Sequence, residues 1–169
     1  FDSGNQYEQA LADNPVYREI WDPMIRLNRA AMPALWLSWP EDQHFPMDCF
    51  AASYRAMCGA YTVALMPRMG HSIPATYAPP DSYAFAKYVV KNGHPWGQMI
   101  HAGTAGSRAE VEFRSDIAPE KALLVSTTDT GYTGNRKWIE TPAELRQQNG
   151  NWFATAMLPE NTTAWFINL

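Results

Sequence analysis

The sequence predicts an α/β unit that forms the C-terminal part of a larger parallel sheet, followed by a small all-β sandwich of immunoglobulin-like type. Up to about Trp96, helical and strand-like patterns alternate with short connections, as in βαβ units. Beyond that point no helical periodicity remains, and short strand candidates are separated by turns. We therefore predict an α/β domain over residues 1–100, a linker of small residues over 101–108 and a β-sandwich over 109–169.

Elements of the first unit follow from periodicity and from breaker residues. Two apolar runs of buried-strand type are Ala34–Ser38 and Tyr61–Met66. A proline or a turn precedes most of the helical patterns, and glycine follows the two longest at Gly59 and Gly93. The predicted helical segments are Glu8–Ala12, Val16–Ile20, Met24–Arg29, Pro46–Met57 and Pro80–Lys91.

The second unit contains five short strand candidates with turn residues between them. These strands are Ala109–Phe113, Ala122–Thr127, Lys137–Glu140, Trp152–Met157 and Thr163–Asn168. Their alternation predicts a core drawn from Val111, Phe113, Leu124, Trp152, Phe153 and Phe166.

Bulk composition excludes two classes of partner. The formal net charge is −4, and the 13 Lys and Arg residues are scattered along the chain. Because phosphate backbones are bound by clustered basic side chains, we expect no nucleic-acid partner. No stretch approaches the roughly 20 apolar residues that span a bilayer, so we expect no membrane partner. The first residues resemble neither a signal peptide nor a natural start, and we expect the chain to be a piece of a longer protein.

Two polar residues follow the two predicted parallel strands. Asp42 comes after the first strand and His71 after the second. Ligands of open parallel sheets gather outside the carboxyl ends of the strands, so both residues occupy a suitable loop. A carboxylate there can accept the Nδ1–H of the histidine, whose other nitrogen takes the proton of a serine. The chain order acid-then-histidine is that of α/β-hydrolases, whose serine comes earlier.

Each of these residues also has an ordinary structural interpretation. An Asp after a strand is usually a turn residue or a helix N-cap, and a His beside Gly is usually a loop residue. Glu41 is an alternative acid beside Asp42. His44 can line the substrate entrance as a weak binding residue, although an exposed loop position is the commoner role.

Five motifs mark the segment from Trp21 to Pro95. They are Trp21-Asp22-Pro23, Met32-Pro33-Ala34-Leu35-Trp36, Phe45-Pro46-Met47-Asp48, Ser53-Tyr54-Arg55 and Pro67-Arg68-Met69-Gly70-His71. Together they resemble the end of α/β-hydrolases of the acetylxylan esterase and cephalosporin-C deacetylase-like kind. The resemblance implies a serine esterase with Asp42 as triad acid and His71 as base, acting without a cofactor on acyl esters, acetylated carbohydrate among them. The tail from Thr127 onward resembles a β-domain appended to some of these proteins.

The sequence departs from that family in lacking a nucleophile motif. No Gly-x-Ser-x-Gly occurs, so the serine and the oxyanion hole are expected in an N-terminal remainder of the same hydrolase, which is then a partner of this chain. The glycine-rich stretch 103–107 follows no predicted strand and is assigned neither as a nucleophile nor as a phosphate loop.

Other candidate sites are weaker. His94 and His101 lack metal-ligand spacing, and Asp116 and Asp129 do not form a calcium loop, so we expect no metal. The aromatic residues of the tail can form a sugar-stacking face, although strand tryptophans usually pack in a core. These aromatic residues are Tyr132, Trp138 and Trp152.

Two functional hypotheses follow. In the first, the chain is the C-terminal part of a serine esterase and supplies the acid and the histidine. In the second, it is a non-catalytic binding or interaction module in which the β-sandwich is the working part. The missing serine separates the two, because an esterase needs a companion polypeptide segment and a binding module does not.

Overall fold

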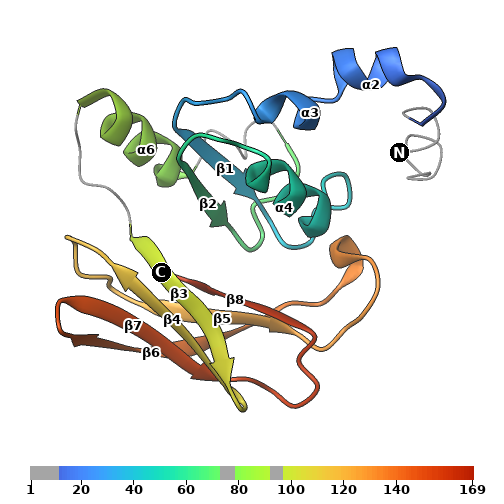
Figure 1. Cartoon of the computed structure of the whole chain (residues 1–169). Coiled ribbons are helices and arrows are strands. Elements are labelled where there is room, and N and C mark those ends of the chain that lie inside the picture. Colours follow the sequence, from blue (N-terminus) through green and yellow to red (C-terminus); the bar gives the residue numbers. More distant parts are fainter. Residues whose placement is uncertain (1–11, 73–78, 92–96) are drawn as a thin grey trace.

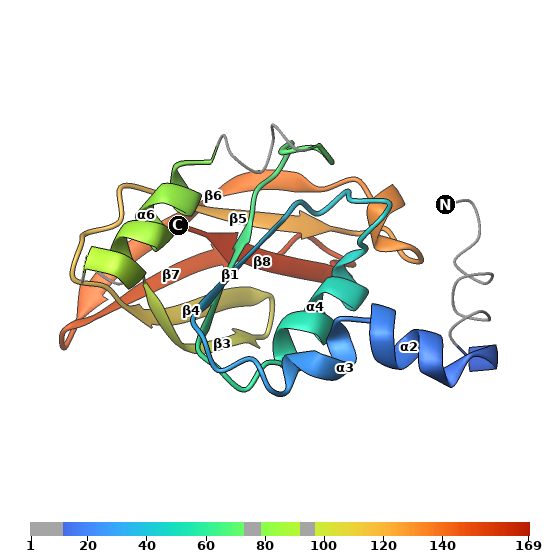
Figure 2. The ribbon, with the colours of Figure 1, turned by 90° about the horizontal axis from the view of Figure 1, so that it is seen from above.

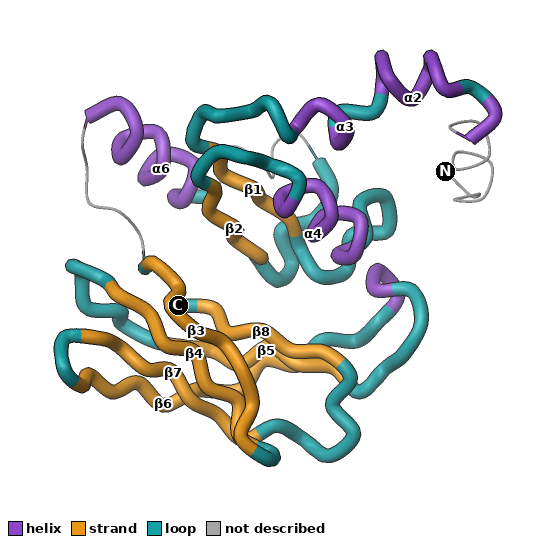
Figure 3. The backbone as a smooth tube through the Cα atoms, viewed as in Figure 1, coloured by secondary structure: helices purple, strands orange, loops and turns teal. Residues whose placement is uncertain are grey.

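The computed structural model describes residues 12–72, 79–91 and 97–169. It has two layers, a helical layer that contains two parallel strands and a second layer of six antiparallel strands (Figure 1). Among the described residues, every helix except one short 3-10 turn belongs to the first layer (Figure 3). The helix expected over Glu8–Ala12 lies almost wholly outside the described residues.

A βαβ unit forms the centre of the first layer. Strand β1 (Ala34–Ser38) pairs in parallel with β2 (Tyr61–Leu65), and Ala34 and Ser38 lie opposite Tyr61 and Leu65. Helix α4 (Met47–Arg55) connects the strands. The ring of Phe50, the buried residue of α4, packs edge-on against Trp36 of β1 with 5.8 Å between centroids. Both predicted strands are therefore confirmed, together with the parallel pairing expected of an α/β unit.

Among the described residues, three further helices belong to this layer. Helix α2 (Pro15–Trp21) begins after Asn14, whose side chain accepts a hydrogen bond from the Tyr17 N–H, and α3 (Met24–Leu27) follows it. Helix α6 (Pro80–Lys91) has the predicted bounds. Seen from above, the β1–β2 pair crosses over the antiparallel sheet while α2 extends to one side (Figure 2). Among the helices described, none is long and apolar enough to span a bilayer.

The second layer is one curled antiparallel sheet. Its strands are β3 (Gln98–Ala105), β4 (Arg108–Arg114), β5 (Ala122–Thr127), β6 (Ile139–Gln148), β7 (Asn151–Met157) and β8 (Ala164–Asn168). The spatial order is β3-β4-β7-β6-β5-β8. The first half of β6 pairs with β5 and the second half with β7, so the sheet curls where β6 changes neighbours. Residues Asn149 and Gly150 join β6 to β7 with positive φ angles of 51° and 82°, as a type I′ hairpin requires.

The curl encloses a core. Phe113, Ala122 and Ala154 are buried together, and Phe113 is 1% exposed. Leu124 is fully buried, and Val111 and Trp152 pack partly buried against the cluster. Of the other predicted core residues, Phe153 lies 4.2 Å beneath the guanidinium of Arg146, and Phe166 packs half-buried against Trp138.

Three expectations about this layer were wrong. The strands form a single curled sheet and not two separate sheets that face each other. The segment 101–108, predicted as a linker, instead supplies most of β3, the turn to β4 and the first residue of β4. Strand β6 also runs eight residues further than the predicted Lys137–Glu140.

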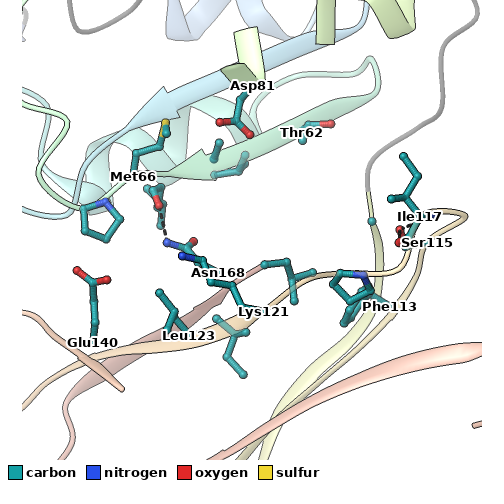
Figure 4. Close-up of a pocket in the computed structure, with 18 of the residues that line it drawn as sticks. Thr62, Met66, Asp81, Phe113, Ser115, Ile117, Lys121, Leu123, Glu140 and Asn168 are labelled. Carbon is teal, nitrogen blue, oxygen red and sulfur yellow. Dashed lines mark hydrogen bonds between the residues drawn. The ribbon is translucent and has the colours of Figure 1, made fainter. Parts of the chain in front are cut away.

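Side chains of the second layer bind the first. The Asn168 side-chain amide at the end of β8 donates to the carbonyl of Leu65 at the end of β2, at 2.8 Å. Beside this bond, the two layers enclose a hollow of about 590 Å³ between β2, β5 and β8 (Figure 4). Its lining is mainly apolar, with Asp81, Lys121 and Glu140 as its charged members.

Candidate active site

The loop after β1 is folded around a buried carboxylate. Asp42 lies four residues beyond the end of β1 and is 4% exposed. Its Oδ1 accepts hydrogen bonds from the backbone N–H groups of His44 at 2.8 Å and Phe45 at 3.0 Å. This local turn fixes the carboxylate just before α4 begins, as the structural interpretation of an Asp after a strand expects.

The loop after β2 brings His71 to the same place. It turns through Arg68 and Gly70, which have positive φ angles of 65° and 78°. The Nδ1 of His71 lies 2.9 Å from Oδ2 and 3.2 Å from Oδ1 of Asp42. The expected geometry is therefore confirmed, because the two residues follow neighbouring parallel strands and lie within hydrogen-bond reach.

This contact fixes the tautomer of the histidine. Burial alone raises the pKa of Asp42, but hydrogen bonds from His71, Phe45 and His44 outweigh it, and the pKa is lowered overall. An ionised carboxylate only accepts, so Nδ1 carries the proton and donates it to Asp42. The lone pair of Nε2 then lies on the side of the ring away from Asp42.

Folding stability should depend on pH through this carboxylate. The pKa of Asp42 is lower in the folded chain than in the unfolded chain, where an Asp titrates near about 3.9. The ionised carboxylate therefore stabilises the folded chain fully at pH values above the pKa of the unfolded chain. This stabilisation is lost as the pH falls through the lower pKa of the folded chain. We expect the free energy of unfolding in urea to fall more steeply over this acid range in the wild type than in Asp42→Asn. Equal slopes would contradict a stabilising role of the pair.

Aromatic rings surround the histidine. The imidazole of His44 stacks on His71 with 4.4 Å between centroids and 26° between planes, and the Phe45 ring lies 5.4 Å away. The side chain of His71 is 40% exposed. It borders an open hollow of about 490 Å³ at the surface. The hollow is lined by Trp39, Glu41, Gln43, His44, His71 and Gly134.

The other sequence candidates take different places. Glu41 lines the hollow but makes no described contact with His71, so the carboxylate that pairs with His71 is that of Asp42. His44 lines the same hollow, where its predicted role as a substrate-binding residue stays a prediction. His101 is exposed on β3, and His94 lies outside the described residues.

The aromatic residues of the tail do not gather into one stacking face. Trp138 packs on Phe166 with 5.6 Å between centroids, and Trp152 packs against the sheet core. Tyr132 is exposed, but its hydroxyl donates to the carbonyl of Gln43 in the loop 39–46 between β1 and α4, called the acid loop below because it carries Asp42. This part of the tail therefore contacts the Asp42 loop, which the sequence did not suggest.

Asp42, His44 and His71 also offer three ligand atoms within 4.8 Å of one another, as a metal site would. However, both carboxylate oxygens of Asp42 already accept hydrogen bonds from protein N–H groups. A metal would have to displace the bond to His71, so the geometry suits an acid–base pair better than a metal centre.

Sequence reasoning missed Trp39, Gln43 and Gly134 as neighbours of the pair. Trp39 and Gln43 belong to the acid loop, so their presence follows from their nearness to Asp42. Gly134 is 92 residues away in the sequence and comes from a 3-10 turn (Thr133–Asn135) between β5 and β6. No local pattern marks such a contact.

Comparisons with protein families, with curated proteins and with solved structures find no match to this chain.

Proposed function

We propose that this chain supplies the acid and the base of a serine esterase of the α/β-hydrolase kind, acting on acyl esters and foremost on acetyl esters. The observation that carries the proposal is the 2.9 Å contact between Asp42 and His71, which follow neighbouring parallel strands. The proposed substrates include acetylated carbohydrate. The serine and the oxyanion donors come from an N-terminal remainder of the same hydrolase.

The pair would act as a proton carrier. His71 Nε2 takes the hydroxyl proton of the serine as the serine oxygen attacks the ester carbonyl. Asp42 stabilises the imidazolium that forms. The imidazolium then gives this proton to the departing alcohol, which leaves an acyl-serine. Water attacks the acyl-serine with the same histidine as base, and the products are a carboxylic acid, an alcohol and the regenerated serine.

The proposed cycle needs this N-terminal remainder, because the sequence of the present chain contains no Gly-x-Ser-x-Gly nucleophile motif. The open hollow beside the ring has room for a seryl group and an ester.

The proposal is tested by comparing the chain with its parent polypeptide. We expect the parent to hydrolyse p-nitrophenyl acetate and to be labelled by a fluorophosphonate on a serine upstream of residue 1. The chain alone should show neither turnover nor label. His71-dependent turnover by the chain alone would show that the nucleophile lies within it. A parent with neither label nor turnover would favour the binding-module hypothesis.

A further inference from the structure

The loop between β5 and β6, residues 128–138, reaches out of the antiparallel sheet to the acid loop (Figure 1). The Tyr132 hydroxyl donates to the carbonyl of Gln43, the residue after Asp42. The Gln43 amide donates to Asn135 Oδ1 at 3.2 Å. The N–H of Met47, at the start of α4, donates to Thr133 Oγ1 at 3.0 Å. The acid loop is thus bound to the β5–β6 loop at Gln43, within the Asp42 turn, and at Met47, just after it.

Gly134 packs directly against the backbone of the acid loop. It is buried, and a Cβ at this position would lie 2.7 Å from the Asp42 carbonyl oxygen and 3.0 Å from the Gln43 Cα. The Tyr132 ring also lies 2.9 Å from this position, but the atoms of Asp42 and Gln43 belong to the backbone and cannot move aside as a flexible side chain can. The φ angle of Gly134 lies outside the left-handed region, so alanine is excluded by lack of space and not by backbone strain.

The β5–β6 loop is itself held to the sheet. Asp129 Oδ2 accepts the Lys137 N–H at 2.8 Å, which ties the two ends of the loop together. The Thr163 hydroxyl, just before β8, donates to the carbonyl of Asp129. Within the loop, the Arg136 guanidinium donates to the Gly131 carbonyl at 2.6 Å. Because the β5–β6 loop is fixed to the sheet in this way, it can hold the acid loop at a constant position relative to the sheet.

A second contact joins the sheet to the loop that carries His71. The Arg68 guanidinium lies 2.6 Å from the carboxylate of Glu140 in β6. Arg68 is 78% exposed, so this ion pair contributes little by itself. The Asn168 amide adds a bond to the Leu65 carbonyl at the end of β2. The sheet therefore contacts the loops of both members of the pair.

We propose that the β5–β6 loop is a positioning element that fixes Asp42 relative to His71, with Gly134 as its contact point. The catalytic consequence of this inference rests on the proposed esterase function. The geometric part does not, because it concerns only where the carboxylate lies. The antiparallel sheet is then a part of the active-site scaffold and not an independent appendage.

The test compares Gly134→Ala, Tyr132→Phe and Thr133→Val with two matched controls. Gly103→Ala makes the same change on β3, where a Cβ would meet only the end of the exposed His101 side chain. Tyr83→Phe removes a hydroxyl from an exposed residue of α6. The first readout is the titration of the Asp42 carboxyl carbon by NMR in this chain. The second is kcat and KM of the parent polypeptide for p-nitrophenyl acetate.

We expect Gly134→Ala to raise the pKa of Asp42 toward its ordinary value, because displacement weakens the hydrogen bonds that lower it. In the parent, kcat should fall about 10- to 100-fold, since a shift of about 1 Å at reacting groups costs that much. The KM for this small ester should change little. Tyr132→Phe and Thr133→Val should give smaller effects in the same direction, and the controls should match the wild type.

The possible results separate the two proposals. If all three loop variants leave the titration of Asp42 and kcat unchanged, the positioning role is wrong. If Gly134→Ala does not fold, the positioning role is wrong when Tyr132→Phe and Thr133→Val both leave the titration of Asp42 and kcat unchanged. If the loop variants move the titration while the parent keeps full turnover with His71→Ala, the positioning role holds and the esterase function fails. If His71→Ala is inactive and the loop variants change nothing, the positioning role alone fails.

Discussion

Replacing His71 with alanine in the parent polypeptide is expected to abolish ester hydrolysis. Nε2 of this residue is the proposed acceptor of the serine proton, and no neighbouring group can take over that task from the same position. His44 stacks on the ring of His71, but the described hydrogen bond of His44 to a carboxylate comes from its backbone N–H and not from its ring. Loss of the histidine in a serine protease lowers kcat by on the order of 10⁶-fold. A loss of similar size should appear in the kcat for p-nitrophenyl acetate.

The fold should survive this change. The His71 side chain is 40% exposed, so its removal leaves no large cavity in a core. Circular dichroism and the urea midpoint serve as controls, and fluorophosphonate labelling should fall together with turnover. Normal turnover by a folded His71→Ala variant would require the hydrolase assignment to be abandoned.

Asp42→Asn is expected to lower kcat of the parent by on the order of 10⁴-fold, the effect of the same change in a serine protease. An amide cannot stabilise the imidazolium. Its NH₂ group also favours the histidine tautomer in which Nδ1 accepts and Nε2 carries the proton. A base in that tautomer cannot deprotonate serine, although the shape of the site is nearly retained.

Glu41→Gln is the matched control for this change. Glu41 neighbours Asp42 and lines the same hollow, but it makes no described contact with His71. We expect its neutralisation to cost less than about tenfold, because no described contact with His71 is lost. If Glu41→Gln were as damaging as Asp42→Asn, the assignment of the acid would have to be exchanged.

The elements predicted best are those with a strong local signal. Strand β1 is an uninterrupted apolar run after a proline, and α6 begins at Pro80 with a clear helical period. Strand β5 is buried along nearly its whole length and reads as an apolar run. In each case the bounds match the prediction, because one residue pattern determines both the conformation and the burial.

Strands β3 and β6 lack such a signal. β3 is an edge strand with almost every side chain exposed, and its Ala102-Gly103-Thr104 segment therefore resembles a linker. β6 contains Pro142 and ends in polar residues, and both features are typical of a segment in which a strand has already ended. The structure places Pro142 in the half that pairs with β5, just before the strand changes neighbours. Both β3 and β6 are held in the sheet by pairing with other strands, and no local sequence pattern indicates this pairing.

The same distinction applies to the site. The nearness of Asp42 and His71 could be predicted, because the carboxyl ends of adjacent parallel strands meet at one edge. Contact with Gly134 could not, since it depends on how two layers stack and on the length of the β5–β6 loop. Tyr132 attracted attention as an exposed aromatic residue, but for sugar binding and not for its bond to Gln43.

The backbone contact at Gly134 limits how one layer of this chain can be exchanged for that of another protein. A chimera that keeps residues 1–96 and receives the sheet of another protein would lose the loop that braces the Asp42 turn. Recombination between the two layers would therefore have to preserve the length of the β5–β6 connection and a residue without a Cβ at its tip. The two layers therefore depend on each other at this contact, even though each has its own hydrogen-bonded sheet.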